Sequence, residues 1–65
     1  MSFAENLKQM RKANDLDQKK LAKILSVSPK TISHWETGYT EPSIAQLIAL
    51  ANYFNITIDE LVDRQ

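Results

Sequence analysis

Apolar residues recur along this chain at spacings of three and four, the period of an α-helix, and no segment alternates as a strand would. The first stripe is formed by Phe3, Leu7 and Met10. Ser2 and Glu5 have the spacing of a capping box at its start. The first helix is expected to end near Asn14-Asp15, because both residue types tolerate the left-handed backbone of a helix terminus.

Capping residues also mark the second and third helices. Asp17 is the expected N-cap of the second helix, and Ser28 followed by Pro29 opens the third. The third helix is expected to end at Gly38, the only glycine in the chain. In the second helix, four apolar residues are expected to face inward and three lysines to face water: Leu21, Ala22, Ile24 and Leu25, against Lys19, Lys20 and Lys23.

Two further capping boxes, Ser43 with Gln46 and Thr57 with Glu60, predict a fourth helix and a short fifth one that frays near Arg64. The apolar residues of the fourth helix cover a wide arc, which predicts that this helix is the central and most buried element: Ile44, Leu47, Ile48, Leu50, Ala51 and Phe54. The fold class is therefore all-α, a compact five-helix arrangement, with residues 1–65 as a single domain.

The connection between the second and third helices is very short, only residues 26–28. Such a connection holds two helices at a steep angle, as in a helix-turn-helix over about residues 18–38. Ala22 supplies the small side chain that a close helix approach needs, and Val27 the apolar anchor of the turn. Ile32 and Trp35, three residues apart, are expected to bury one face of the third helix.

The opposite face of the third helix carries hydrogen-bonding side chains of modest length. At ~100° per residue, they share an arc pointing away from Ile32 and Trp35. An ordinary exposed helix face more often carries Glu/Lys pairs, whereas donors and acceptors of this size suit the base edges of the DNA major groove. The arc consists of Lys30, Ser33, His34 and Thr37, with Thr31 on its flank.

With these elements in order, the chain resembles the lambda-repressor-like (Cro/repressor, or XRE) helix-turn-helix family. The segment QKKLAKILSVSPKTISHWETG, residues 18–38, is similar to the helix-turn-helix of that family. The segment LKQMRKANDLDQ resembles its first helix, and EPSIAQLIALANYFNITIDEL its fourth and fifth. The resemblance thus covers the whole chain and implies a sequence-specific DNA-binding transcriptional regulator, in first place a repressor of prophage or bacterial genes.

The resemblance also implies roles for individual residues. Base reading falls to Lys30, Thr31, Ser33 and His34, and phosphate contact to Gln18, Ser28, Thr37, Gly38 and Tyr39. Arg11 and Glu36 match a pair that links the first and third helices in many members. Two residues depart from the family pattern, since Asp15 and Ser26 stand where glycine is frequent.

Charge is distributed unevenly, although the formal net charge is zero. Residues 1–34 carry seven basic and three acidic side chains, and residues 35–65 one basic and five acidic. The resulting field can orient the basic half toward phosphates. A run of lysines is also what a solvated helix face carries, so charge supports DNA binding without establishing it.

Residue content argues against an enzyme or a metalloprotein. The chain has no cysteine, one histidine and one glycine, so it lacks a Cys/His pair, a glycine-rich phosphate loop and a metal-ligand cluster. No cofactor, metal or small-molecule effector is therefore expected. No apolar run approaches the ~18 residues of a membrane span and no signal peptide is visible, which predicts a cytoplasmic protein without a membrane partner.

The expected partner is double-stranded DNA, bound as a homodimer on a palindromic operator. Ile58 and Val62 make the fifth helix the candidate dimer interface. Two alternatives remain open at this stage. One is an antitoxin or protein-binding module of a toxin–antitoxin pair that also binds DNA, and the other is an adaptor that kept the fold and lost the DNA contacts.

Overall fold

The computed structural model describes residues 2–62 as five α-helices joined by short turns. They are α1 (Phe3–Ala13), α2 (Gln18–Leu25), α3 (Pro29–Thr37), α4 (Ile44–Phe54) and α5 (Ile58–Val62). Within these residues there is no strand, so the all-α, five-helix prediction is confirmed. The predicted fraying near Arg64 lies outside the described residues.

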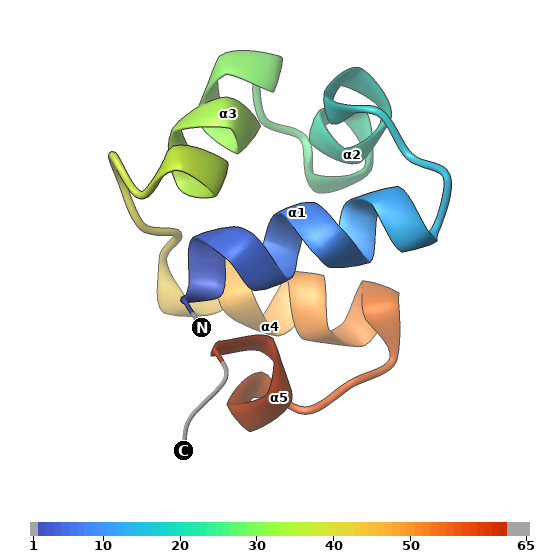
Figure 1. Ribbon diagram of the computed structural model, residues 1–65, viewed down its shortest axis with the longest axis vertical. Coiled ribbons are helices and arrows are strands. Elements are labelled where there is room, and N and C mark those ends of the chain that lie inside the picture. The colour runs from blue at the N-terminus through green and yellow to red at the C-terminus, as the bar shows by residue number, and fades with distance from the viewer. Residues whose placement is uncertain (1, 63–65) are drawn as a thin grey trace.

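Helix α1 runs across the middle of the molecule, with α2 and α3 on one side and α4 and α5 on the other (Figure 1). Its apolar stripe includes Leu7, which is fully buried, and the helix packs mainly against α3 and α5. The other fully buried large side chains come one from each remaining helix, so every helix contributes to one shared core: Leu21, Ile32, Leu50 and Leu61. Trp35, Ala22 and Ala51 complete this core.

The helix boundaries follow the predicted caps. Asp17 Oδ1 accepts the Lys20 N–H at 2.7 Å, and Ser28 Oγ accepts the Thr31 N–H at 3.2 Å. The capping boxes of α4 and α5 are reciprocal: Gln46 Oε1 accepts the Ser43 N–H at 2.8 Å and Glu60 Oε1 accepts the Thr57 N–H at 3.0 Å. Each cap satisfies donors that a helix start would otherwise leave without partners.

Within residues 2–62, four residues have a positive φ, each one or two positions after the last residue of a helix: Asp15, Ser26, Gly38 and Asn55. Gly38 ends α3 with a φ of 79°, as predicted for the C-cap glycine. Asp15 and Ser26, with φ of 57° and 59°, occupy the two positions where the family often has glycine. At both positions the left-handed backbone brings the Cβ atom close to the following carbonyl oxygen, which destabilises any residue other than glycine.

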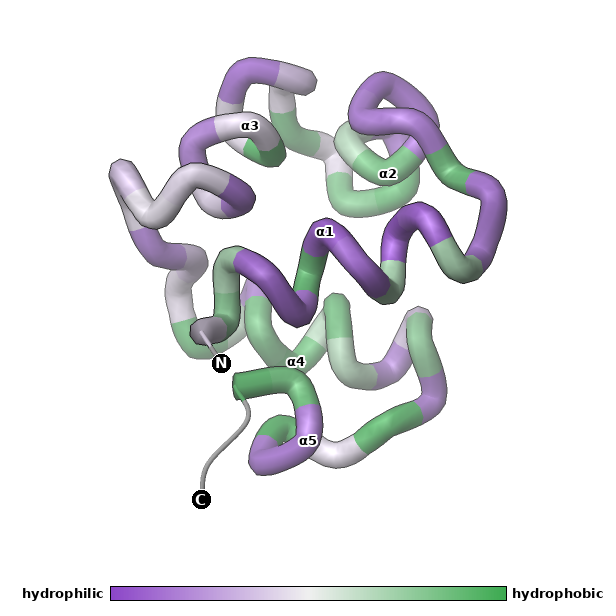
Figure 2. The backbone as a smooth tube through the Cα atoms, in the orientation of Figure 1, coloured by the Kyte–Doolittle hydropathy of each residue, from purple (hydrophilic) through white to green (hydrophobic). Residues whose placement is uncertain are grey.

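Two burial predictions were wrong. Helix α4 is not the most buried element, because Ile44 is 75% exposed and Ile48 45% exposed. Only an arc of about 100°, the one containing Leu50 and Ala51, faces the core. Helix α4 has no charged residue and is largely green in Figure 2, and its exposed isoleucines carry this apolar character onto the outer surface.

Ile24 was also expected to face inward, yet it is 42% exposed. In the eight-residue helix α2, the buried arc is set by Leu21 and Ala22, with Leu25 between them. At ~100° per residue, Ile24 lies on the far side of Leu21, outside this arc. The three lysines of α2 are exposed, as predicted.

Candidate nucleic-acid interface

Helices α2 and α3 are connected by Ser26, Val27 and Ser28, as expected for a helix-turn-helix. Ser26 turns the chain through a left-handed backbone, and the Val27 N–H then donates to the Ala22 carbonyl at 2.9 Å. Val27 packs against the core, and Ala22 is buried where α2 approaches its neighbours. The turn therefore has an apolar anchor and a small residue at the positions that the sequence indicated.

Helix α3 is held by its inner face, where Ile32 is fully buried and Trp35 is 2% exposed. The opposite face is accessible. Lys30 and Thr37 are exposed, and Ser33 and His34 are partly exposed, as is Thr31 on the flank. The structure thus brings the five expected side chains to the accessible part of one short helix.

A buried ion pair fixes this helix against α1. Arg11 Nε donates to Glu36 Oε2 at 2.6 Å and Arg11 Nη2 donates to Glu36 Oε1 at 3.0 Å, with side chains 10% and 3% exposed. A third guanidinium hydrogen bond goes to the Leu16 carbonyl at 2.9 Å. Hydrogen bonds from the guanidinium to the carboxylate raise the pKa of Arg11 above its ordinary value, against the opposing effect of burial.

Gln18 belongs to the same network. Its Nε2 donates to Glu36 Oε1 at 3.1 Å, so one carboxylate joins the first residue of α2 to α1 and α3. A side-chain amide has two N–H donors, so this bond uses one of the two. Gln18 therefore ties the start of α2 to the ion pair that holds α3.

The hydroxyl groups at the two ends of α3 are already engaged. Ser28 Oγ and Thr31 Oγ1 lie 3.0 Å apart, in hydrogen-bond contact. Thr37 Oγ1 donates to the His34 carbonyl at 3.2 Å, which uses its only hydrogen. Thr37 has to rotate away from this carbonyl before its hydroxyl can donate to any ligand.

The main-chain donors after α3 are engaged as well. The Gly38 N–H donates to the Trp35 carbonyl at 3.3 Å, and the Tyr39 and Thr40 N–H groups donate to the His34 carbonyl at 2.9 and 3.3 Å. The main-chain N–H groups of this stretch are therefore not free, whereas the Tyr39 side chain is 75% exposed. Its ring meets that of His34 edge-on, with centroids 4.8 Å apart.

One buried polar residue was not anticipated from the sequence. Asn6 is 8% exposed, and its Nδ2 donates to the Leu61 carbonyl at 3.3 Å, linking α1 to α5. The available signal was its position, since Asn6 stands on the apolar face of α1 between Phe3 and Met10. A polar residue within such a stripe indicates a buried hydrogen bond.

Residues 2–62 contain neither a helix that could span a membrane nor a cluster of metal ligands. The longest helices between residues 2 and 62 have 11 residues, too few to traverse a bilayer. Over the same range, His, Asp and Glu side chains do not gather in threes as metal ligands would.

A compact bundle that presents a polar helix face beyond a three-residue turn defines a helix-turn-helix DNA-binding module. A family model described as "Helix-turn-helix" matches residues 7–61. The chain therefore belongs to the helix-turn-helix family of transcriptional regulators, in its lambda-repressor-like (XRE) branch.

Relatives and solved structures include members of this class. The transcriptional activator BcrR of Enterococcus faecalis is 42% identical over 62 residues, which are 95% of this chain and 30% of that protein. A transcriptional regulator from Listeria innocua has a TM-score of 0.93 at 41% identity, over 97% of this chain and 59% of that one. The P22 c2 repressor, solved with a synthetic operator, has a TM-score of 0.89 at 32% identity, over 95% and 94% of the two chains.

The chain spans about half or less of the length of two curated relatives that it matches, 30% of BcrR and 53% of the regulator AnsR of Bacillus subtilis. These relatives are transcriptional regulators, a non-enzymatic class, and an antitoxin is also among the matches. This chain therefore corresponds to the helix-turn-helix module of these relatives, the part that contains α3.

Proposed function

We propose that this protein is a sequence-specific transcriptional regulator that reads a palindromic operator by inserting α3 into the major groove. The observation that carries the proposal is the two-sided α3, locked inward by Ile32 and Trp35 and polar outward. A helix fixed in this way presents donors and acceptors at constant positions, which base-edge recognition requires. The P22 c2 repressor, similar over nearly all of both chains, was solved on operator DNA.

Base reading is assigned to Lys30, Thr31, Ser33 and His34, the accessible residues on the outer face and flank of α3. Phosphate contact is assigned to residues at both ends of α3 and at the start of α2, where exposed lysines reinforce it: Gln18, Ser28, Thr37, Gly38 and Tyr39. Because the N–H of Gly38 is engaged, its contribution is to shape the turn that delivers Tyr39. Phosphate contacts fix register, and base contacts give sequence preference.

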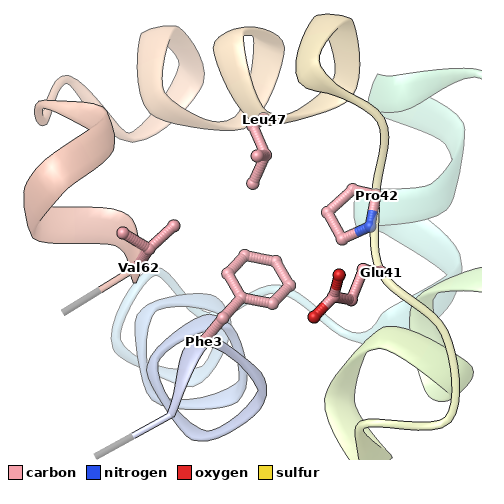
Figure 3. A pocket seen from close by; sticks show the side chains of 5 residues that line it. All are labelled: Phe3, Glu41, Pro42, Leu47 and Val62. Carbon is pink, nitrogen blue, oxygen red and sulfur yellow. The ribbon is translucent and has the colours of Figure 1, made fainter. Parts of the chain in front are cut away.

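The operator is proposed to be palindromic because a homodimer presents two recognition helices about 34–36 Å apart along DNA. The side of α5 supplies the candidate contact surface. Ile58 is exposed there, and Val62 lines an open groove of about 300 Å³ with Phe3, Leu47 and Pro42, while the Glu41 carboxylate lies at its rim (Figure 3). A second copy that covers these apolar side chains would remove them from water.

Selection of duplexes from a random DNA pool at near-physiological salt tests the proposal. An enriched motif with two half-sites about one helical turn apart is expected. Lys30→Ala should then cost about 1–3 kcal/mol on the selected duplex and relax one base position, whereas Lys19→Ala is the matched control that weakens all duplexes alike. A pool without any enriched motif would overturn the proposal.

Dimer formation has its own measurement. Sedimentation of the wild type and of Ile58→Lys, with and without the selected duplex, should show two chains per duplex for the wild type only. A wild-type complex that contains one chain on a single half-site contradicts the palindrome and leaves base reading intact.

A second candidate, an antitoxin or protein-binding module that also binds DNA, is favoured by one observation. The outer face of α4 exposes Ile44, Ile48 and Tyr53 and carries no charge, and such faces mark protein contacts. Under this alternative, motif selection by the purified chain fails or is weak until a toxin partner is added. Tight selection by the chain alone favours the regulator.

A further inference from the structure

We propose that Tyr39 is a positioning residue for base reading: its ring sets the orientation of the His34 imidazole on the outer face of α3. This inference rests on the function proposed above and adds to it, because the phosphate role assigned to Tyr39 uses its hydroxyl group, whereas positioning uses its ring. The two roles involve different atoms of one side chain and can be separated by substitution.

The first step of the argument is that the main chain of both residues is fixed. The His34 carbonyl accepts hydrogen bonds from the Tyr39 N–H at 2.9 Å, the Thr40 N–H at 3.3 Å and the Thr37 hydroxyl at 3.2 Å. The left-handed Gly38, with a φ of 79°, turns the chain back over the last turn of α3. Tyr39 is therefore delivered to His34 by a closed turn and not by a free loop.

The second step is the contact itself. The rings of His34 and Tyr39 are 4.8 Å apart between centroids with an interplanar angle of 61°, an edge-to-face geometry that aromatic pairs favour. Tyr39 is 75% exposed, so its ring is not a core residue, and it nevertheless sits against His34. His34 is only partly exposed although it belongs to the outward face. The Tyr39 ring thus limits the orientations open to the imidazole.

The third step is what this restriction provides. A histidine that reads a base edge must present one ring nitrogen at a defined place, and ordering a free side chain on binding lowers affinity. An imidazole already held by a neighbouring ring loses less freedom. Removal of the Tyr39 ring should therefore weaken binding to the preferred duplex by about two- to tenfold, the range expected for one aromatic pair.

The experiment compares four single variants and one double variant on the selected duplex and on duplexes altered at the base pair that His34→Ala ceases to discriminate. Tyr39→Phe keeps the ring and removes the hydroxyl, and Tyr39→Ala removes both. Tyr53→Ala is the matched control, because Tyr53 makes a similar edge contact with Phe54 on α4 at 5.1 Å. Circular dichroism checks that each variant is folded, which the exposure of both tyrosines favours.

Positioning predicts that Tyr39→Phe retains discrimination at this base pair, that Tyr39→Ala loses it, and that Tyr53→Ala changes nothing. In the His34→Ala background, Tyr39→Ala should cause no further loss of discrimination. The NMR signals of the His34 ring protons should be shifted by the neighbouring ring in wild type and Tyr39→Phe, and not in Tyr39→Ala.

Three results would overturn the inference. Tyr39→Phe could lose discrimination as fully as Tyr39→Ala, Tyr39→Ala could keep it, or His34→Ala could alter no base preference while the motif is still selected. Each of these leaves the proposed regulator function standing. A random pool that returns no motif refutes that function first, and the positioning role falls with it.

Discussion

The buried pair of Arg11 and Glu36 gives the most quantitative prediction. Glu36→Ala leaves the guanidinium of Arg11 inside the protein, where the Leu16 carbonyl is its remaining hydrogen-bond acceptor among residues 2–62. Removing one partner of a buried pair typically costs about 3–5 kcal/mol. At roughly 0.05–0.15 kcal/mol per residue, a domain of this size has only about 3–10 kcal/mol in total. Glu36→Ala should therefore remove a third or more of the stability.

Urea unfolding followed by tryptophan fluorescence measures this loss. Trp35 is the only tryptophan, is 2% exposed and directly precedes Glu36, so its emission reports on the structure around the pair. With an m-value of ~1–3 kcal/mol/M, a loss of 3 kcal/mol lowers the midpoint by at least ~1 M. A midpoint shift well below this would show that water reaches the pair and would refute the burial argument.

A paired replacement provides the control. Arg11→Met with Glu36→Leu removes both charges, and apolar replacement of a whole buried pair is often neutral or stabilising by about 1–4 kcal/mol. The double variant should therefore unfold at a higher urea concentration than Glu36→Ala. If both variants were equally unstable, the loss would come from packing around Trp35 and not from an uncompensated charge.

The pair should not weaken as the solution becomes basic. Its carboxylate raises the pKa of Arg11, so the folded state holds this proton more tightly than the unfolded state. Such a contribution is fully present below the unfolded pKa and is lost only as the pH rises through the higher folded pKa. Between neutral pH and pH ~10, far below both values for an arginine, the difference in stability between wild type and Glu36→Ala should stay constant. Urea titrations at three pH values check this, and a difference that shrinks across this range contradicts the assignment.

Three further substitutions test the packing and the turns by thermal unfolding. Asn6→Ala should cost about 1–3 kcal/mol because it leaves the Leu61 carbonyl without its buried donor, while Asn52→Ala on the exposed side of α4 serves as its control and should cost little. Ser26→Gly should stabilise the folded state by about 0.5–1 kcal/mol, because glycine removes the strain of the left-handed backbone at a φ of 59°. Part of this gain is offset because glycine also raises the conformational entropy of the unfolded chain. Gly38→Ala should destabilise by a similar ~0.5–1 kcal/mol through φ alone, because no atom lies within 4 Å of the added Cβ; a much larger loss would indicate a steric clash that the structure does not contain.

Local signals in the sequence predicted the helix boundaries well because caps act over three or four residues. Each capping side chain accepts a hydrogen bond from the main-chain N–H three residues ahead, so the cap and the helix start that it stabilises lie in one short segment. The capping residues are Asp17, Ser28, Ser43 and Thr57. The inward seam of α3 followed from Ile32 and Trp35 for a similar reason, since their spacing alone places them on one face.

The errors concern quantities that depend on distant parts of the chain. Periodicity identified the apolar residues of α4 but could not say how many neighbours cover them, and α1 occupies the centre instead (Figure 1). The pairing of Arg11 with Glu36, 25 residues apart, came from the family resemblance, because no local pattern links the two. Asn6 was missed because its partner, the carbonyl of Leu61, lies 55 residues away.

The structure also explains how so small a core can hold a recognition helix in place. Helix α3 is fixed from three directions: its start by the Ser28 cap, its inner face by Ile32 and Trp35, and its last turn by Glu36. The carboxylate of Glu36 is bonded to both α1 and α2, so a rotation of α3 about its axis would break hydrogen bonds to two helices at once. An apolar contact tolerates sliding, whereas a forked ion pair has one geometry. The orientation of the outward face is therefore set by polar contacts, and the apolar core supplies the stability on which they depend.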